Sequence, residues 1–315
     1  MFLKLRLYML LLLMFAIVYG LVIAISQYLG FGNFVFYAIF TVLIITVQYM
    51  VGPKLVEFAM RVRYVTKEDE PKLYKIVEDM AKKAKIKTPK IGISEMQLAN
   101  AFAFGKSKND SRVCVTRGLL DILDEKELKA VIGHEISHIK NRDVMVITLL
   151  SVIPMICWYI AWSFMFSRSS RGNNALLGLG AFVLYFITNL LVLYGSRIRE
   201  FYADRGSVEL GNNPHYLATA LYKLVQSSSR YNPQQLKAVE GYKAFFVNDP
   251  STSRSEINEI RQVDKNFDGK INKDELKDMK NVKIELRRAD KIMEVFSTHP
   301  NMLRRIKYLS SLEKK

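Results

Sequence analysis

A long apolar stretch near the N-terminus carries no charged side chain. Between Leu7 and Pro53 the sequence contains no Asp, Glu, Lys or Arg. A membrane-spanning helix needs about 20 consecutive apolar residues, so this stretch is long enough for two crossings. Two further charge-free stretches, Val144–Ser167 and Gly172–Ser196, bring the prediction to four transmembrane helices. A cleaved signal peptide is the alternative, but the first stretch is longer than a signal peptide's apolar core and a second span follows at once.

Basic residues near the span ends predict the orientation of the chain, because cytoplasmic flanks are enriched in Lys and Arg. They gather on one side of the predicted membrane: Lys4, Arg6, Lys54, Arg61, Arg63, Lys140, Arg142, Arg197 and Arg199. Only Arg168 and Arg171, between the third and fourth spans, argue the other way. The sequence therefore predicts a multi-pass protein of the plasma membrane whose polar regions face the cytoplasm. We attribute the formal net charge of +16 to contact with the anionic lipid bilayer and expect no nucleic-acid partner.

The segment His134-Glu-Ile-Ser-His138 predicts a metal site. On a helix, the two histidines lie one turn apart on the same face and can bind the same ion. Glu135 is then placed beside the ion, where a carboxylate can take a proton from water. This is the HExxH pattern of zinc peptidases. The chain has only four histidines, so chance is a poor explanation for two of them at this spacing around a Glu.

A catalytic zinc needs a third protein ligand, and Glu200 is the best candidate. His138 lies six residues before the third predicted span and Glu200 lies four after the fourth. If both helices continue, these positions stand about 9 Å and about 6 Å beyond the membrane, at about 1.5 Å per residue. Asp204 is one turn further and can orient a ligand histidine. The alternative for Glu200 is a solvated carboxylate between Arg199 and Arg205.

The order of several short motifs resembles the HtpX-type membrane zinc metalloproteases, gluzincins related to the CAAX prenyl proteases. The resemblance runs from about Pro71 to Ile306. The segments that carry it are Asn100-Ala-Phe-Ala-Phe-Gly105, Thr116-Arg-Gly-Leu-Leu120, His134–His138 with Asn141-Arg-Asp143, Glu200-Phe-Tyr-Ala-Asp204, and His299-Pro300. The prediction of four spans fits the HtpX branch, since the prenyl proteases have more.

The resemblance implies roles for further residues. It implies that Glu200 is the third zinc ligand, with one Zn²⁺ per chain, and that Glu135 is the general base. It also implies that the segment formed by Asn100, Ala101, Phe102 and Ala103 is an edge strand that binds the substrate backbone, which agrees with recognition by strand addition. In the prenyl proteases, the His of His-Pro and an Arg six residues later line the catalytic cavity, which here indicates His299 and Arg305. The alternative for His299 is a helix-start residue before Pro300.

One segment departs from this family pattern. The positions of a calcium-binding EF-hand loop are filled, in order, by Asp264, Asn266, Asp268, Lys270 through its carbonyl, Asn272 and Glu275. The residues on either side, 253–263 and 275–280, can form the flanking helices. We interpret residues 251–290 as an EF-hand-like insertion that can bind Ca²⁺. The alternative is a polar linker that matches by accident, and single EF-hands usually pair.

The resulting fold prediction is mainly α: four transmembrane helices with a cytoplasmic α+β zincin-like catalytic domain and the inserted segment. The predicted divisions are residues 1–53 for two spans, 54–143 for the catalytic part with the HExxH helix, 144–196 for the other two spans, and 197–315 for the rest of the catalytic part. The resemblance implies misfolded or damaged membrane proteins, or other unfolded polypeptides, as substrates. Two alternatives stay open: a CAAX-type prenyl-protein protease, and a non-catalytic calcium-responsive membrane scaffold. The oligomeric state is not predicted.

Overall fold

The computed structural model of the chain describes residues 13, 34–165, 172–232, 234, 246–247, 250, 252–284 and 286–313. The chain divides into two compact units. The first unit comprises Met1–Gly52 and Met145–Ile198, and the second comprises Pro53–Val144 and Arg199–Lys315. Apart from Leu13, the first predicted span lies outside the described residues, as does the connection between the third and fourth spans.

Three long helices stand where the second, third and fourth spans are predicted. They are α2 (Phe34–Ala59), α6 (Asp143–Met165) and α7 (Gly172–Glu209). In the first unit, α6 and α7 pack together through the buried Leu150 and Val192. Among the described residues, one segment, Leu176–Glu209 of α7, is long and apolar enough to cross a membrane. The other predicted crossings stay predictions.

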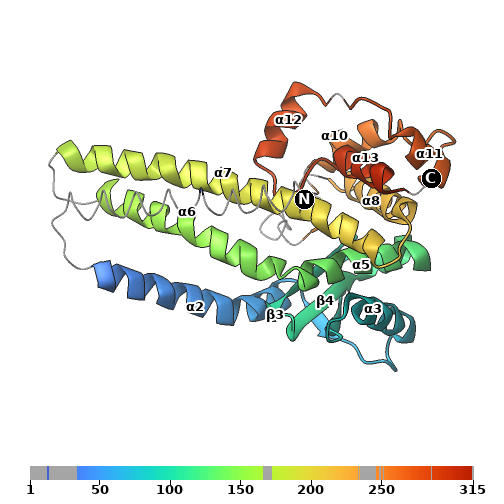
Figure 1. Cartoon of the computed structure of the whole chain (residues 1–315), viewed down its shortest axis with the longest axis horizontal. Coiled ribbons are helices and arrows are strands. Elements are labelled where there is room, and N and C mark those ends of the chain that lie inside the picture. Colours follow the sequence, from blue (N-terminus) through green and yellow to red (C-terminus); the bar gives the residue numbers. More distant parts are fainter. Residues whose placement is uncertain are drawn as a thin grey trace. The chain divides into compact units, whose positions relative to one another are not determined.

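The second unit contains a small mixed sheet, drawn with its flanking helices in Figure 1. Its strands are β1 (Val62–Tyr64), β2 (Lys90–Ser94), β3 (Ala101–Ser107) and β4 (Asp110–Thr116), in the spatial order β1-β2-β4-β3. Strand β2 pairs with β4 in parallel, and the two outer pairings are antiparallel. Strand β3 lies at one end of the described sheet, which fits the edge strand expected at Asn100–Ala103.

The helices of the second unit account for its mainly α character. They are α3 (Pro71–Ala84), α4 (Arg117–Ile122), α5 (Glu125–Lys140), α8 (Pro214–Ser229), α10 (Ser253–Ile260), α11 (Lys273–Asp278), α12 (Arg288–Val295) and α13 (Met302–Leu312). The predicted HExxH helix is α5. The two helices that flank the EF-hand-like loop are α10 and α11. The larger apolar cluster of this unit receives residues from the sheet, α3, α5, α8 and α13.

Small residues let α5 and the end of α7 approach closely. A Cβ atom on Gly133 would lie 2.4 Å from Nδ2 of Asn212, and one on Gly206 would lie 2.3 Å from Oγ of Ser137. The hydroxyl of Ser207 donates to the Ala130 carbonyl at 2.6 Å. Any larger side chain at the two glycines would separate the helices. The close contact is what brings the carboxylates of α7 to the histidines of α5.

The structure differs from the sequence prediction at β1 and agrees with it at the end of the fourth predicted span. Helix α7 runs without a break from Gly172 to Glu209, as the placement of Glu200 beyond the span assumed. The change from apolar to charged residues at Arg197 alters the side chains but not the backbone hydrogen bonding, so the helix continues. Strand β1 was not predicted, because three residues are too few to show a periodic pattern.

Candidate metal centre

Helix α5 has a well-defined start. Asp124 accepts hydrogen bonds from the backbone N–H groups of Lys126 and Glu127, and Glu127 bonds back to the Asp124 N–H, which completes a capping box. Glu127 is also buried in an ion pair with Lys223 of α8 at 2.7 Å. These contacts fix the helix that carries both histidines.

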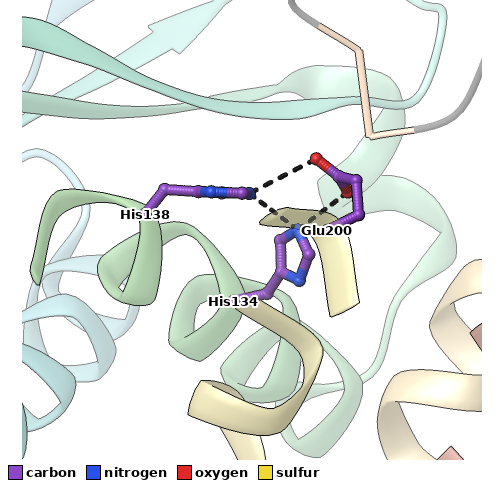
Figure 2. Close-up of side chains that lie close together, drawn as sticks. All are labelled: His134, His138 and Glu200. Carbon is purple, nitrogen blue, oxygen red and sulfur yellow. Dashed lines mark hydrogen bonds and ion pairs between the residues drawn. The ribbon is translucent and has the colours of Figure 1, made fainter. Parts of the chain in front are cut away.

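Three side chains from two helices converge on one point (Figure 2). The Nε2 atoms of His134 and His138 lie 3.1 Å apart. Glu200 of α7 places Oε2 at 3.4 Å from Nε2 of His134 and Oε1 at 3.5 Å from Nε2 of His138. The arrangement unites the three ligands that the sequence predicts.

The distances fit a single zinc ion. Zinc binds His nitrogen and carboxylate oxygen at about 2.0–2.2 Å with tetrahedral geometry, which places ligand atoms about 3.3–3.6 Å apart. The three observed separations are close to this range. Oε2 of Glu200 is buried and lies 3.1 Å from Nη1 of Arg305 and 3.4 Å from Nε2 of His134. A buried carboxylate needs compensating positive charge, which Arg305 supplies in part and a bound cation would complete.

A carboxylate behind each histidine orients the ring. Nδ1 of His134 lies 2.9 Å from Oδ1 of Asp204, and Nδ1 of His138 lies 2.5 Å from Oδ2 of Asp143. Because Nδ1 of each ring is engaged, Nε2 of each ring is available to the metal. Asp204 was predicted in this role. Asp143 was quoted only as part of a motif, and its role depends on a turn that the sequence pattern did not reveal.

That turn is made by Arg142, which has a φ of +58° at the end of α5. The left-handed backbone ends the helix and returns the chain toward the preceding turn, so Asp143 reaches His138. Asp143 is also paired with Arg199 at 3.0 Å. A residue with positive φ other than Gly is uncommon, and a helix-end position is where it is tolerated.

The charges around the histidines favour a cation. Burial alone would lower the pKa of His134, but its hydrogen bonds with Asp204 and Glu200 outweigh this effect and raise the pKa to about 9. The same two carboxylates would stabilise a metal in place of the proton. Burial raises the pKa of Glu135, which is 4% exposed. A carboxylate with a raised pKa is a stronger base and suits proton transfer near neutral pH.

Arg305 lies behind the three ligands. It is fully buried and donates to both oxygens of Asp204, at 3.0 and 2.6 Å. Its Nη1 lies 3.1 Å from Oε2 of Glu200 and donates to the Val247 carbonyl at 2.9 Å. These contacts indicate that Arg305 positions Glu200 and Asp204. The catalytic role implied by the resemblance stays a prediction.

His299 lies beside the third ligand. Its Nδ1 is 3.6 Å from Oε1 of Glu200, and neither ring nitrogen makes a hydrogen bond with the described residues. The residue precedes α13, whose N-cap is Asn301. The fourth histidine, His215, lies at the start of α8 next to Tyr216 and is outside the three-residue cluster.

The predicted substrate strand is anchored at Asn100. Asn100 is buried: its N–H donates to the Thr116 hydroxyl at 2.8 Å, and its carbonyl accepts from the Thr116 N–H at 2.9 Å. Its Oδ1 accepts a hydrogen bond from the Val247 N–H at 3.0 Å. Val247 thus links Asn100 to Arg305 through its N–H and its carbonyl. The stacked rings of Phe102 and Phe104 pack in a second apolar cluster. The side chain of Asn100 is therefore committed to structure, and substrate binding by Ala101–Ala103 through the backbone stays a prediction.

The EF-hand-like loop adopts a turn-rich conformation. Asp264 accepts hydrogen bonds from the N–H groups of Asp268 and Gly269, and Gly269 has a φ of +79°. Oε1 of Glu275 accepts from the Lys265 N–H at 2.9 Å, and Oε2 accepts from the Asn272 N–H at 2.9 Å. Glu275 therefore ties the start of the loop to its end.

Comparisons with known proteins agree with this site. The sequence pattern of Peptidase family M48 matches residues 67–313. A Protease HtpX homolog of Methanothermobacter thermautotrophicus is 51% identical over 223 residues, which cover 71% of this chain and 86% of that protein. A Protease HtpX homolog of Moorella thermoacetica is 32% identical, with 87% and 83% covered.

A solved structure shows a similar fold. The crystal structure of Ste24p from S. mikatae superposes with a TM-score of 0.50 at 13% identity. The match covers 93% of this chain and 61% of that one. At this identity, the likeness concerns the fold alone.

Proposed function

Since the chain belongs to peptidase family M48 and is a zinc metalloprotease, we propose that it hydrolyses peptide bonds of misfolded or damaged membrane proteins in the plasma membrane. The observation that supports this proposal is that Glu200 is part of Leu176–Glu209, the helix segment within the described residues that is long and apolar enough to cross a membrane. A metal ligand on such a helix stands near the lipid surface. The substrates best placed to reach it are polypeptides attached to the same membrane.

In this proposal the protein's residues divide the work of hydrolysis. His134, His138 and Glu200 would hold zinc, which when bound supplies a Lewis acid toward the scissile carbonyl and a nucleophilic water. Glu135 accepts the proton of the attacking water and later gives it to the leaving amine. Asp204 and Asp143 hold the histidine rings in place throughout.

We also propose that the second unit, which contains the metal centre, faces the cytoplasm. Lys140 and Arg142 flank α6 before its apolar part, and Arg197 and Arg199 follow the apolar part of α7. A bias of basic residues on one side of the spans supports this orientation. The substrate backbone would then be bound by residues 101–103 at the edge of β3, where main-chain hydrogen bonds give affinity with little demand on sequence.

The test of this function uses Glu135→Gln, since Glu135 is not among the predicted zinc ligands. Purified protein in lipid vesicles is given a single-span membrane protein whose cytoplasmic domain has been destabilised. Wild type should cleave it, whereas Glu135→Gln should keep its zinc and lose about 10²–10⁴-fold in rate, the usual contribution of a general base. Glu125→Gln changes an exposed acid of the same helix and is the matched control.

Two results would contradict the proposal. Cleavage by Glu135→Gln at the wild-type rate would exclude Glu135 as the base. Cleavage of a prenylated CAAX peptide, with the destabilised membrane protein left intact, would favour the prenyl-protease alternative.

We further propose that the loop from Asp264 to Glu275 binds Ca²⁺. Asp264 and Glu275 are 2% and 6% exposed, and within the described residues neither forms an ion pair with Lys or Arg. Buried carboxylates without a cation are costly. The oxygens of Asp264, Asn266, Asp268 and Glu275 accept loop N–H groups yet keep lone pairs for a metal. Hard oxygen ligands suit calcium rather than zinc.

A contact from outside the loop supports the calcium proposal. An EF-hand loop usually pairs with the loop of a second EF-hand. Here the side chain of Thr219 in α8 contacts Ile271, the central residue of the loop. The Thr219 hydroxyl accepts from the Ile271 N–H and donates to the Ile271 carbonyl, each at 3.0 Å. The side chain of Thr219 therefore satisfies both the N–H and the carbonyl of Ile271.

Calorimetry decides the calcium proposal. Wild type should bind Ca²⁺ with measurable heat and melt at a higher temperature in its presence, because a ligand that binds the folded state stabilises it. Glu275→Gln should lose both effects. Asp278→Asn, which removes an exposed acid just outside the loop, should keep them. Equal heats and melting temperatures for wild type and Glu275→Gln would contradict calcium binding.

A further inference from the structure

Helix α12, labelled in Figure 1, exposes a row of apolar side chains. Ile292 is 62% exposed, Met293 47% and Val295 42%, and Phe296, which directly follows the helix, is 54% exposed. Positions 292, 295 and 296 are three and four residues apart and therefore lie on one side of the helix. Single exposed apolar residues are ordinary, but neighbouring ones mark an interaction surface. We call these four residues the α12 strip.

The charges that border the α12 strip are basic. Lys291 directly precedes the strip, Arg287 lies one helical turn earlier, and both are exposed. The acids of the helix, Asp290 and Glu294, fall on the opposite side at helical spacing and are half-buried. Glu294 is moreover paired with Arg304 of α13 at 3.4 Å. The acids thus face the protein, and the outward face of α12 is apolar with a positive border.

This pattern is typical of a helix that lies on the surface of an anionic bilayer. Apolar side chains enter the boundary between headgroups and acyl chains, and Lys and Arg contact the anionic headgroups. An unfolded polypeptide would also cover the apolar residues, but it carries no fixed negative charge to match the basic border. A lipid surface matches both features of α12.

Lipid is also close at hand for this helix. Helix α7 contains the segment Leu176–Glu209, which is long and apolar enough to cross a membrane. The same helix passes from the first unit into the second between residues 198 and 199, and α12 belongs to the second unit. Such a tether keeps the local concentration of lipid high, so a weak surface contact is sufficient.

We propose that α12 lies on the membrane surface, with the α12 strip at the level of the outer acyl chains and Arg287 and Lys291 on anionic headgroups. The contact would act on the metal centre through Glu294, whose Oε1 accepts a hydrogen bond at 3.2 Å from the N–H of Asn301, the N-cap of α13. Helix α13 carries Arg305, which donates to Asp204. The inference goes beyond the proposed function, because lipid binding by α12 does not require peptide hydrolysis.

The first experiment measures contact between α12 and lipid in the full-length protein. Ile292→Cys is labelled with the polarity-sensitive dye NBD and reconstituted into vesicles of phosphatidylcholine, with or without phosphatidylserine. In the vesicles with phosphatidylserine, the emission should shift to the blue and be quenched by lipids that carry a spin label on the acyl chain. The control is Asp121→Cys, an exposed position on α4, where the dye should stay in water and unquenched.

The second experiment tests the basic border. In the labelled Ile292→Cys protein, Arg287→Gln and Lys291→Gln together should lower the ratio of lipid-bound to free helix about 30-fold, the usual effect of two basic residues near an anionic surface. Lys277→Gln removes an exposed basic residue of α11 and should leave the ratio unchanged. Circular dichroism confirms that each variant is folded.

Three results would overturn the inference. A dye at position 292 that spin-labelled lipids do not quench in either kind of vesicle would exclude lipid contact. A blue shift that appears only when a destabilised membrane protein is added would mean that the strip binds polypeptide. Equal quenching in both kinds of vesicle, unchanged in the Gln variants, would exclude recognition of anionic headgroups. The quenching assay involves no hydrolysis, so a failure of the proposed protease function would imitate none of these results.

Discussion

The contact between Thr219 and Ile271 gives the sharpest quantitative prediction. Thr219 is 3% exposed, and its hydroxyl serves both backbone groups of Ile271, which is fully buried. Thr219→Val keeps the shape of the side chain but removes both hydrogen bonds. An N–H and a carbonyl would then be buried without partners, at about 1–3 kcal/mol each. The variant should therefore lose about 2–6 kcal/mol of folding free energy.

The expected shift in melting temperature follows from the size of the unit. For a domain of about 200 residues, each kcal/mol lowers the melting temperature by about 2–4 °C, so a loss of about 4 kcal/mol corresponds to about 8–16 °C. Thr219→Ser keeps the hydroxyl and loses only a methyl group. It should melt well above Thr219→Val, and this difference isolates the hydroxyl.

The two cysteines offer an assay suited to a protein in detergent. Both are free and buried, Cys114 in β4 and Cys157 in α6. Burial raises the pKa of the Cys114 thiol, so it is unreactive in the folded protein. In a Cys157→Ala background, a thiol-reactive dye reports the unfolding of the second unit through Cys114. Equal melting temperatures for Thr219→Val and Thr219→Ser would refute the assigned energy and, with it, the role of Thr219 in holding the loop.

The remaining predictions concern the metal centre and the substrate strand. Glu200→Ala should greatly reduce the zinc content, as measured by elemental analysis. The control Glu209→Ala, which removes an exposed acid of the same helix, should keep its zinc. Full zinc occupancy in Glu200→Ala would mean that another residue is the third ligand. Arg305→Lys keeps the positive charge but cannot donate to both oxygens of Asp204. The zinc affinity, measured by competition with a chelator, should therefore fall about 10–100-fold. An unchanged zinc affinity would show that Arg305 does not support the metal ligands. Ala103→Pro should impair cleavage without loss of zinc, because Asn100 and Phe102 face β4 in the ladder and the N–H of Ala103 faces the open edge of β3; normal turnover in a folded Ala103→Pro protein would count against this strand.

The parts of the site that the sequence predicts are those set by spacing along one helix. His134, Glu135 and His138 follow from the four-residue spacing, and Asp204 follows from Glu200 in the same way. Their environment could not be predicted, because it depends on contacts between distant segments. Arg305 meets Asp204 only because α13 packs into the second unit. The role of Asp143 was not predicted for a different reason: its contact with His138 depends on the left-handed backbone conformation of one residue, Arg142.

The helices that flank the EF-hand-like loop are packed into the core of the second unit. They bury Ile257, Ile260 and Leu276 in the same apolar cluster that contains the HExxH helix. Helix α10 is also joined to the chain near His299, because Asn301, the N-cap of α13, donates to Glu259 of α10 at 3.1 Å. A cation that orders the loop would thus stabilise the two helices that support α13 and, through α13, Arg305. If this reasoning is right, Ca²⁺ should raise the zinc affinity of wild type but not of Glu275→Gln, since two ligands that favour the same folded arrangement reinforce each other.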